Sequence, residues 1–217
     1  MKKEFIKRLL SSVILIPIAF FFIIKGSFFF NFFLFICFMI TSYEWHMMSK
    51  KKKYNIFGHL FLLLSFICTY LVYNSGDDGF VNSSGTGLYV FLGILLVCIS
   101  TDIGGYVFGK LLKGPKLTKI SPNKTYAGVF GGYLFSIISL SSYVNYLGQN
   151  FELENFVLVI VISTISQIGD ITVSYFKRLS KIKNTGKLIP GHGGILDRID
   201  GMIFAFPFYY ILHLIIF

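Results

Sequence analysis

Long runs of apolar residues constrain this chain more than any other feature of its sequence. Two such runs, residues 9–24 and 28–40, follow one another near the N-terminus. Hydrophobic residues make up 54% of the chain and charged residues 14%, whereas an average soluble domain has about 25% charged residues. A core formed by 217 residues cannot bury runs of this length, so they require lipid as their solvent. The sequence therefore predicts an all-α polytopic membrane protein.

The hydropathy pattern predicts about seven transmembrane helices. They lie at residues 9–24, 27–44, 56–73, 87–108, 126–147, 155–174 and 201–217. The first two are separate spans, because one helix over both runs would be about 52 Å long, too long for a single span. We expect one membrane-embedded domain, residues 1–217, with N-terminal helical spans at 1–99 and catalytic spans at 100–217.

The basic residues lie in clusters between the predicted spans. A nucleic-acid surface would instead combine basic and aromatic residues on one continuous face, so nucleic acid is not an expected partner. Lys and Arg are enriched in cytoplasmic loops. If the N-terminus is cytoplasmic, every basic residue except Lys25 falls on the inner side. We therefore expect a multi-pass protein of a bacterial-type inner membrane, with cytoplasmic loops at residues 109–125 and 175–200.

Acidic residues gather at the inner ends of the predicted spans. Four carboxylates share this position: Asp102, Asp170, Asp197 and Asp200. One acid at the end of a span can simply reach water. Four acids from three spans indicate function, because ionisable groups within a membrane usually face protein or a cavity.

The sixth predicted span carries a polar stripe. Its members are Ser163, Gln167, Asp170 and Ser174. Their spacing places them on one face of a helix, which must turn away from lipid. Hydrogen bonding between helices would explain the serines, but it explains Asp170 less well.

Asp197 and Asp200 are three residues apart at the start of the last predicted span. Like charges at this spacing on a helix repel one another. A divalent cation between them would turn the repulsion into attraction. Oxygen ligands without a His or Cys cluster suit Mg²⁺, particularly where substrate phosphates complete the coordination shell.

A glycine turn, residues 190–194, precedes these acids. Glycine lets the backbone approach an anion closely and turn its N–H groups toward it, so Gly193 and Gly194 are candidate phosphate ligands. His192 could donate to a phosphate oxygen, although an isolated histidine often has no chemical role.

The other inner loop contains a Ser-Pro turn next to the fifth span. Lys119, Ser121 and Lys124 flank this turn and are candidates to hold a triphosphate. The preceding lysines, residues 110–116, are interpreted as determinants of membrane orientation. Gly128 and Gly132 predict close packing of the fifth span against another helix.

The segment from Ser174 to Asp200 resembles the signature of the phosphatidate cytidylyltransferases, also called CDP-diglyceride synthetases. It reads S-Y-F-K-R, four further residues, and K-N-T-G-K-L-I-P-G-H-G-G-I-L-D-R-I-D. Four other segments also resemble the family: Glu44-Trp45, Gly169-Asp170, T-D-I-G-G-Y-V-F-G-K and K-I-S-P-N-K-T. One position departs from the family pattern, because Asn184 stands where the family usually has Asp.

The resemblance implies CTP and phosphatidate as substrates, Mg²⁺ as cofactor, a helical membrane fold and often a homodimer. It implies that a phosphate oxygen of phosphatidate attacks the α-phosphorus of CTP and that pyrophosphate leaves. The metal ligands would be Asp170, Asp197 and Asp200. The further catalytic residues would be Lys177, Arg178, His192 and Arg198. The substrate-binding residues would be Asp102, Lys119, Ser121, Lys124, Lys183, Gly193 and Gly194.

Two other functions remain open at this point. A related CTP-dependent enzyme could act on another lipid acceptor, such as an isoprenoid alcohol or an archaeal lipid phosphate. An ion-coupled transporter would instead place its acids near mid-span and show paired inverted repeats, and we find no such repeat.

Overall fold

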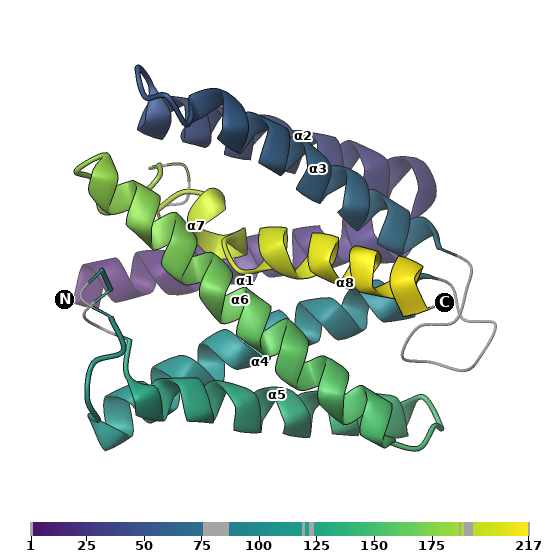
Figure 1. Ribbon diagram of the computed structural model, residues 1–217. Helices are drawn as coiled ribbons and strands as arrows, with labels where there is room; N and C mark the ends of the chain where they lie inside the picture. The colour runs from purple at the N-terminus through teal and green to yellow at the C-terminus, as the bar shows by residue number, and fades with distance from the viewer. Residues whose placement is uncertain are drawn as a thin grey trace. The chain divides into compact units, whose positions relative to one another are not determined.

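The computed structural model of this chain describes residues 2–75, 87–118, 120–121, 124–186, 188 and 193–216. Over these residues it is helical and contains no strand (Figure 1). Eight helices are present there: α1 (Lys2–Lys25), α2 (Ser27–Ser49), α3 (Asn55–Asn74), α4 (Gly87–Leu112), α5 (Tyr126–Tyr146), α6 (Leu153–Leu179), α7 (Leu196–Ile199) and α8 (Met202–Ile216).

Five of these helices are long and apolar enough to cross a membrane. They are α2 from Phe28 onward, α3, α4, α5 and α6. Two shorter apolar helices cover Val13–Lys25 and Met202–Ile215. The helical membrane class is therefore confirmed, whereas the count of seven spans and the cytoplasmic N-terminus remain predictions.

The chain forms two compact units. The first combines Met1–Tyr70 with Phe176–Ile199, and the second combines Leu71–Tyr175 with Asp200–Phe217. Each unit thus joins segments that are distant in sequence.

Glycines let α4 and α5 of the second unit pack closely (Figure 1). A Cβ atom added at Gly104 would overlap the carbonyl oxygen of Gly131. A Cβ atom at Gly128 would lie 2.8 Å from a carbonyl oxygen of α4, and one at Gly132 would lie 3.1 Å from that of Thr101. The prediction of close packing at Gly128 and Gly132 is therefore confirmed.

The polar stripe of α6 faces the interior of the second unit, as predicted. Ser163 is completely buried and accepts a hydrogen bond of 2.9 Å from the Thr101 hydroxyl. Gln167 donates to the same serine at 3.4 Å. At the next residue of α6, the hydroxyls of Thr164 and Tyr133 lie 2.8 Å apart. These bonds join α6 to α4 and α5 and fix the helix that carries Asp170.

Aromatic packing organises the first unit around Trp45 of α2. The indole nitrogen donates to the Asn55 carbonyl at 3.0 Å, which ties the end of α2 to the start of α3. The indole ring lies 5.2 Å from the ring of Phe176 and 6.1 Å from that of Tyr54, centroid to centroid. Trp45 therefore fixes the last part of α6, from which the signature segment continues.

Candidate active site

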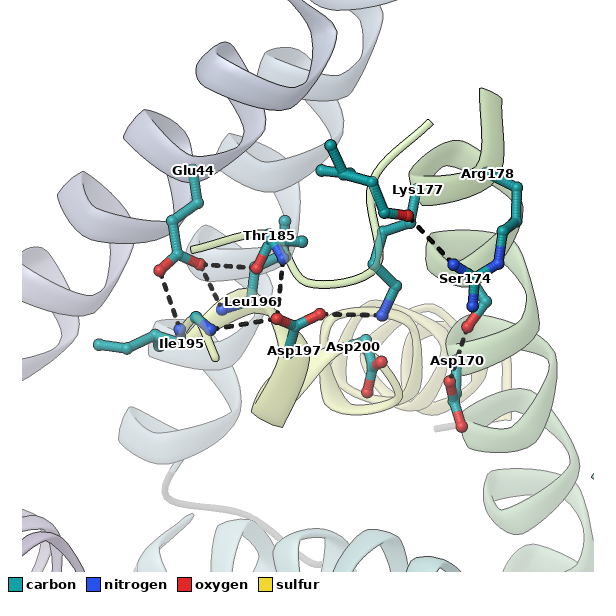
Figure 2. Close-up of polar contacts among 12 residues, drawn as sticks. Glu44, Asp170, Ser174, Lys177, Arg178, Thr185, Ile195, Leu196, Asp197 and Asp200 are labelled. Atoms are coloured by element: carbon teal, nitrogen blue, oxygen red, sulfur yellow. Dashed lines mark hydrogen bonds and ion pairs between the residues drawn. The ribbon is translucent and has the colours of Figure 1, made fainter. Parts of the chain in front are cut away.

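A buried glutamate in the first unit binds the signature segment. Glu44 on α2 is only 2% exposed. Its carboxylate accepts hydrogen bonds from the Thr185 hydroxyl (3.1 Å), the Ile195 N–H (3.0 Å) and the Leu196 N–H (2.8 Å), as Figure 2 shows. The sequence indicates no role for Glu44 beyond its part in the family resemblance. A lone acid within an apolar span was the available signal.

Asp197 binds the same segment from the other side. Its Oδ2 atom accepts hydrogen bonds from the N–H groups of Thr185 (2.8 Å) and Gly194 (3.1 Å). Its Oδ1 atom accepts one from the Lys177 ammonium at 2.9 Å (Figure 2). The Lys177 and Asp197 side chains are 9% and 7% exposed. The two residues therefore form a buried ion pair between the end of α6 and α7.

The surroundings of Asp197 favour its charged form. Burial alone would raise the pKa of its carboxyl group. The hydrogen bond and charge of Lys177, together with the N–H groups of Gly194 and Thr185, act in the opposite direction. The net result is a pKa below the ordinary value of 3.8.

A second ion pair lies in the second unit. Lys124 Nζ lies 2.5 Å from Asp170 Oδ2, and the Ser174 hydroxyl donates to Asp170 Oδ1 at 3.3 Å. The loop before α5 folds back to place this lysine: the Leu117 N–H donates to the Lys124 carbonyl at 2.8 Å. Thr125 then caps α5 by accepting from the Gly128 N–H at 3.1 Å.

Asp200 also belongs to the second unit and is 7% exposed. Its Oδ1 atom accepts a hydrogen bond of 3.1 Å from the Gly201 N–H. A Cβ atom at Gly169 would lie 2.9 Å from the Asp200 carbonyl oxygen, so the backbone of α6 touches the turn before α8. Asp170 and Asp200 therefore come from two segments that pack directly against one another.

Asp197 and Asp200 do not share a helix, which corrects the sequence prediction. Asp197 lies in α7, which ends at Ile199, and Asp200 lies in the turn before α8. The charge of Asp197 is balanced by Lys177. The repulsion expected between neighbours on one helix is thus no argument for a cation bridging them.

The chemistry of the acids in the second unit fits Mg²⁺. Asp170 and Asp200 offer only oxygen atoms, and Asp170 already holds a cationic group, the Lys124 ammonium. In the part of the chain that the structure describes, no three His, Cys, Asp or Glu side chains form a metal-binding group. Water and substrate phosphates would complete the shell, as is usual for Mg²⁺. Asp197 stays a predicted ligand, although both of its oxygen atoms already accept hydrogen bonds.

The predicted glycine cradle needs one correction. The Gly194 N–H donates to Asp197 and is therefore not open to an anion. Gly193 adopts a φ of 96°, a conformation that favours glycine. A Cβ atom there would lie 2.8 Å from Asp197 Oδ2. His192 lies outside the described residues, as does Lys119 of the other loop.

The other predicted site residues are more exposed. Arg178, Lys183 and Arg198 have exposed side chains in the first unit, and Arg178 donates to the Ile182 carbonyl at 3.1 Å. Asp102 is exposed on α4 of the second unit. Ser121 is half-buried, and its carbonyl oxygen accepts a hydrogen bond of 3.0 Å from the Lys124 N–H.

Comparison with known proteins places these features in a family. The sequence profile described as "Cytidylyltransferase family" matches residues 6–82 and 77–216. Proteins named phosphatidate cytidylyltransferase are similar to this chain: 36% identical over 177 residues in Staphylococcus epidermidis, 35% over 177 in Staphylococcus haemolyticus and 33% over 179 in Staphylococcus aureus. Each match covers 81% of this chain and 65% of the relative. The chain therefore spans slightly less than two thirds of the length of these curated relatives.

Proposed function

This chain belongs to the cytidylyltransferase family, and from that premise we propose that it transfers the cytidylyl group of CTP to phosphatidate. The products are CDP-diacylglycerol and pyrophosphate. The family match carries the proposal, because it includes both the signature segment and the loop that bears Lys124. The names of the staphylococcal relatives support phosphatidate as the acceptor.

The reaction requires positioning and neutralisation of charge. A phosphate oxygen of phosphatidate forms a bond to the α-phosphorus of CTP. The bond from that phosphorus to the oxygen bridging the α- and β-phosphates breaks, and pyrophosphate leaves with the electron pair. Four or more negative charges meet in this step, so fixed cations and prealigned reactants supply most of the rate enhancement.

Asp170 and Asp200 are the proposed Mg²⁺ ligands, with Asp197 as the third ligand predicted from the sequence. When bound, the ion neutralises phosphate charge and orients phosphate oxygens. The Asp170 carboxylate lies 2.5 Å from the Lys124 ammonium. We expect Lys124 to leave this carboxylate for the triphosphate of CTP when substrate binds.

Lys177 is the proposed cation of the signature segment. Its ion pair with Asp197 holds the ammonium group in one position, which reduces the entropy lost when a phosphate binds. Arg178, Lys183 and Arg198 have exposed side chains and are proposed to contact the phosphates of either substrate.

The proposed reaction takes place at the inner membrane surface. In this proposal the acyl chains of phosphatidate stay in lipid beside the apolar helices, and its phosphate reaches the loops. We propose that the loops face the cytoplasm, where CTP is available, and that the protein acts as a homodimer. A cysteine introduced at the exposed Lys183 should then react with an impermeant maleimide only from the cytoplasmic side.

A panel of acceptors tests the proposed function. The full chain in detergent, with CTP and Mg²⁺, is given phosphatidate, an isoprenoid alcohol or an isoprenoid phosphate. We expect a lipid-linked CDP product with phosphatidate alone. A product only with an isoprenoid acceptor would assign the chain to a related enzyme with another substrate.

Two variants test the proposed metal ligands. Asp170→Asn and Asp200→Asn should each lose nearly all turnover while remaining folded. Glu154→Gln, the matched change at an exposed position on α6, should keep it. Near-normal turnover of either Asn variant at low Mg²⁺ would make that acid structural.

A further inference from the structure

Glu44 is set apart from the other acids by where its hydrogen bonds go. Its three donors belong to Thr185, Ile195 and Leu196, which are 141 to 152 residues away in the sequence. With 2% of its surface exposed, the side chain cannot reach a substrate directly. Removing a carboxylate that accepts hydrogen bonds from buried N–H groups would leave those donors unsatisfied.

The backbone of the signature segment lies directly on the Glu44 carboxylate. A Cβ atom at Gly186 would lie 2.6 Å from Glu44 Oε1, and one at Gly194 would overlap Oε2. A Cβ atom at either position would therefore displace the buried carboxylate. The contact holds the backbone at these two glycines against the carboxylate.

The same segment connects Glu44 to the Lys177–Asp197 ion pair. Thr185 donates its hydroxyl to Glu44 and its N–H to Asp197. Leu196, which donates to Glu44, directly precedes Asp197 in α7. A displacement of Thr185 or Leu196 would therefore displace Asp197, and with it the ammonium group of Lys177.

We propose that Glu44 is a positioning residue for the transfer reaction: it fixes Thr185, Ile195 and Leu196 and so the place of the Lys177 ammonium. The proposal rests on the proposed function, in which Lys177 binds phosphate. It assigns the second helix a part in the chemistry in addition to its part in the membrane. Because Lys177 would stabilise charge in the transition state, its displacement should lower kcat more than it raises KM.

The central variant is Glu44→Gln, which keeps the shape of the side chain. In wild type three donors share two carboxylate oxygens, whereas the variant offers them a single amide oxygen. We expect kcat to fall about tenfold to a hundredfold, the range for a small misplacement of a reacting group. KM for CTP and for phosphatidate should each change by less than about threefold. Glu154→Gln, the same chemical change at an exposed position, serves as the matched control.

A second pair of variants separates positioning from folding. Thr185→Val removes only the hydroxyl that donates to Glu44, and Thr185→Ser retains it. The serine variant should recover most of the kcat that the valine variant loses. Unchanged kcat in both Glu44→Gln and Thr185→Val, or a loss that only follows the fraction of folded protein, would overturn the proposal.

A measurement without substrate keeps the test independent of the proposed function. Trypsin cleavage after the exposed Lys183 reports how firmly the segment is held. Cleavage should be at least several-fold faster in Glu44→Gln than in wild type and in Glu154→Gln. Equal cleavage rates would refute the positioning role. If Glu44→Gln is cleaved faster but the wild-type protein makes no lipid-linked CDP, the positioning role of Glu44 stands and the proposed reaction is refuted.

Discussion

The ion pair between Lys177 and Asp197 supports a quantitative prediction about stability. Both side chains are less than 10% exposed and their charged atoms are 2.9 Å apart. Lys177→Met keeps most of the aliphatic side chain and removes the charge, so that the buried carboxylate loses its counter-ion. Breaking a buried pair in this way typically costs about 3 to 5 kcal/mol. Two N–H groups still donate to Asp197, so we expect a cost at the lower end, about 3 kcal/mol.

A double-mutant cycle isolates the pair. Asp197→Asn alone leaves the Lys177 ammonium buried without its partner and places an amide donor near other donors. In the double variant both charges are absent. Its loss of unfolding free energy should therefore be smaller than the sum of the two single losses, by about 1 to 3 kcal/mol. Trp45, the only tryptophan of the chain, packs on Phe176 one residue before Lys177. Its fluorescence during thermal or denaturant unfolding in detergent provides the assay.

Acidification provides a second measure of the same pair. The pKa of Asp197 in the folded protein lies below the ordinary value of 3.8. The stability that its ionisation contributes is therefore complete above pH 3.8 and is lost as the pH falls through the folded-state pKa. Lys177→Met removes the hydrogen bond and charge that lower the pKa, while burial still raises it. The variant should therefore lose less stability than wild type on acidification, because a smaller part of its stability depends on the ionisation of Asp197. Equal stability and equal acid profiles for the two proteins would refute this reasoning.

Three further predictions concern the metal, the loop and the helix packing. Lys124→Met removes the competitor for Asp170, so Mn²⁺ binding measured by electron paramagnetic resonance should strengthen several-fold; weaker binding would contradict the proposed exchange. Asn184→Asp should leave the half-saturating Mg²⁺ concentration nearly unchanged if this position orders the loop, whereas a drop of about tenfold, roughly 1.4 kcal/mol, would place it in the metal shell. Gly131→Val should destabilise the protein by about 3 kcal/mol or more through overpacking against α4, while Gly105→Ala, where an added Cβ has ordinary contacts, should melt close to wild type.

Hydropathy identified the helices but not their full length. The sixth span was predicted at residues 155–174, whereas α6 continues to Leu179 and includes Lys177 and Arg178. The fourth was predicted to end at residue 108 and ends at Leu112. Hydropathy detects the part of a helix that suits lipid. Backbone hydrogen bonding continues beyond that part, because charged side chains on an extended helix can remain in water.

The site acids were visible in the sequence, but their partners were not. Spacing along a helix placed Asp170 on a predicted inward-facing stripe; Ser163 of this stripe is completely buried, whereas the Asp170 side chain is 29% exposed and pairs with Lys124. No periodicity relates Lys124 to Asp170 or Glu44 to Leu196, because these contacts depend on how distant segments pack. The same limit explains the correction at Asp197, whose counter-ion lies 20 residues earlier in the chain.

Transfer of the cytidylyl group from CTP to phosphatidate is the central activity proposed for this chain. CTP labelled with ³²P at the α-phosphate is incubated with the full chain, phosphatidate and Mg²⁺, and the lipid phase is extracted. We predict label in CDP-diacylglycerol, formed in equal amount to the pyrophosphate released, and a loss of both products in Asp200→Asn. Label that stays in water-soluble nucleotides under conditions where the wild-type protein is folded would contradict the proposed function.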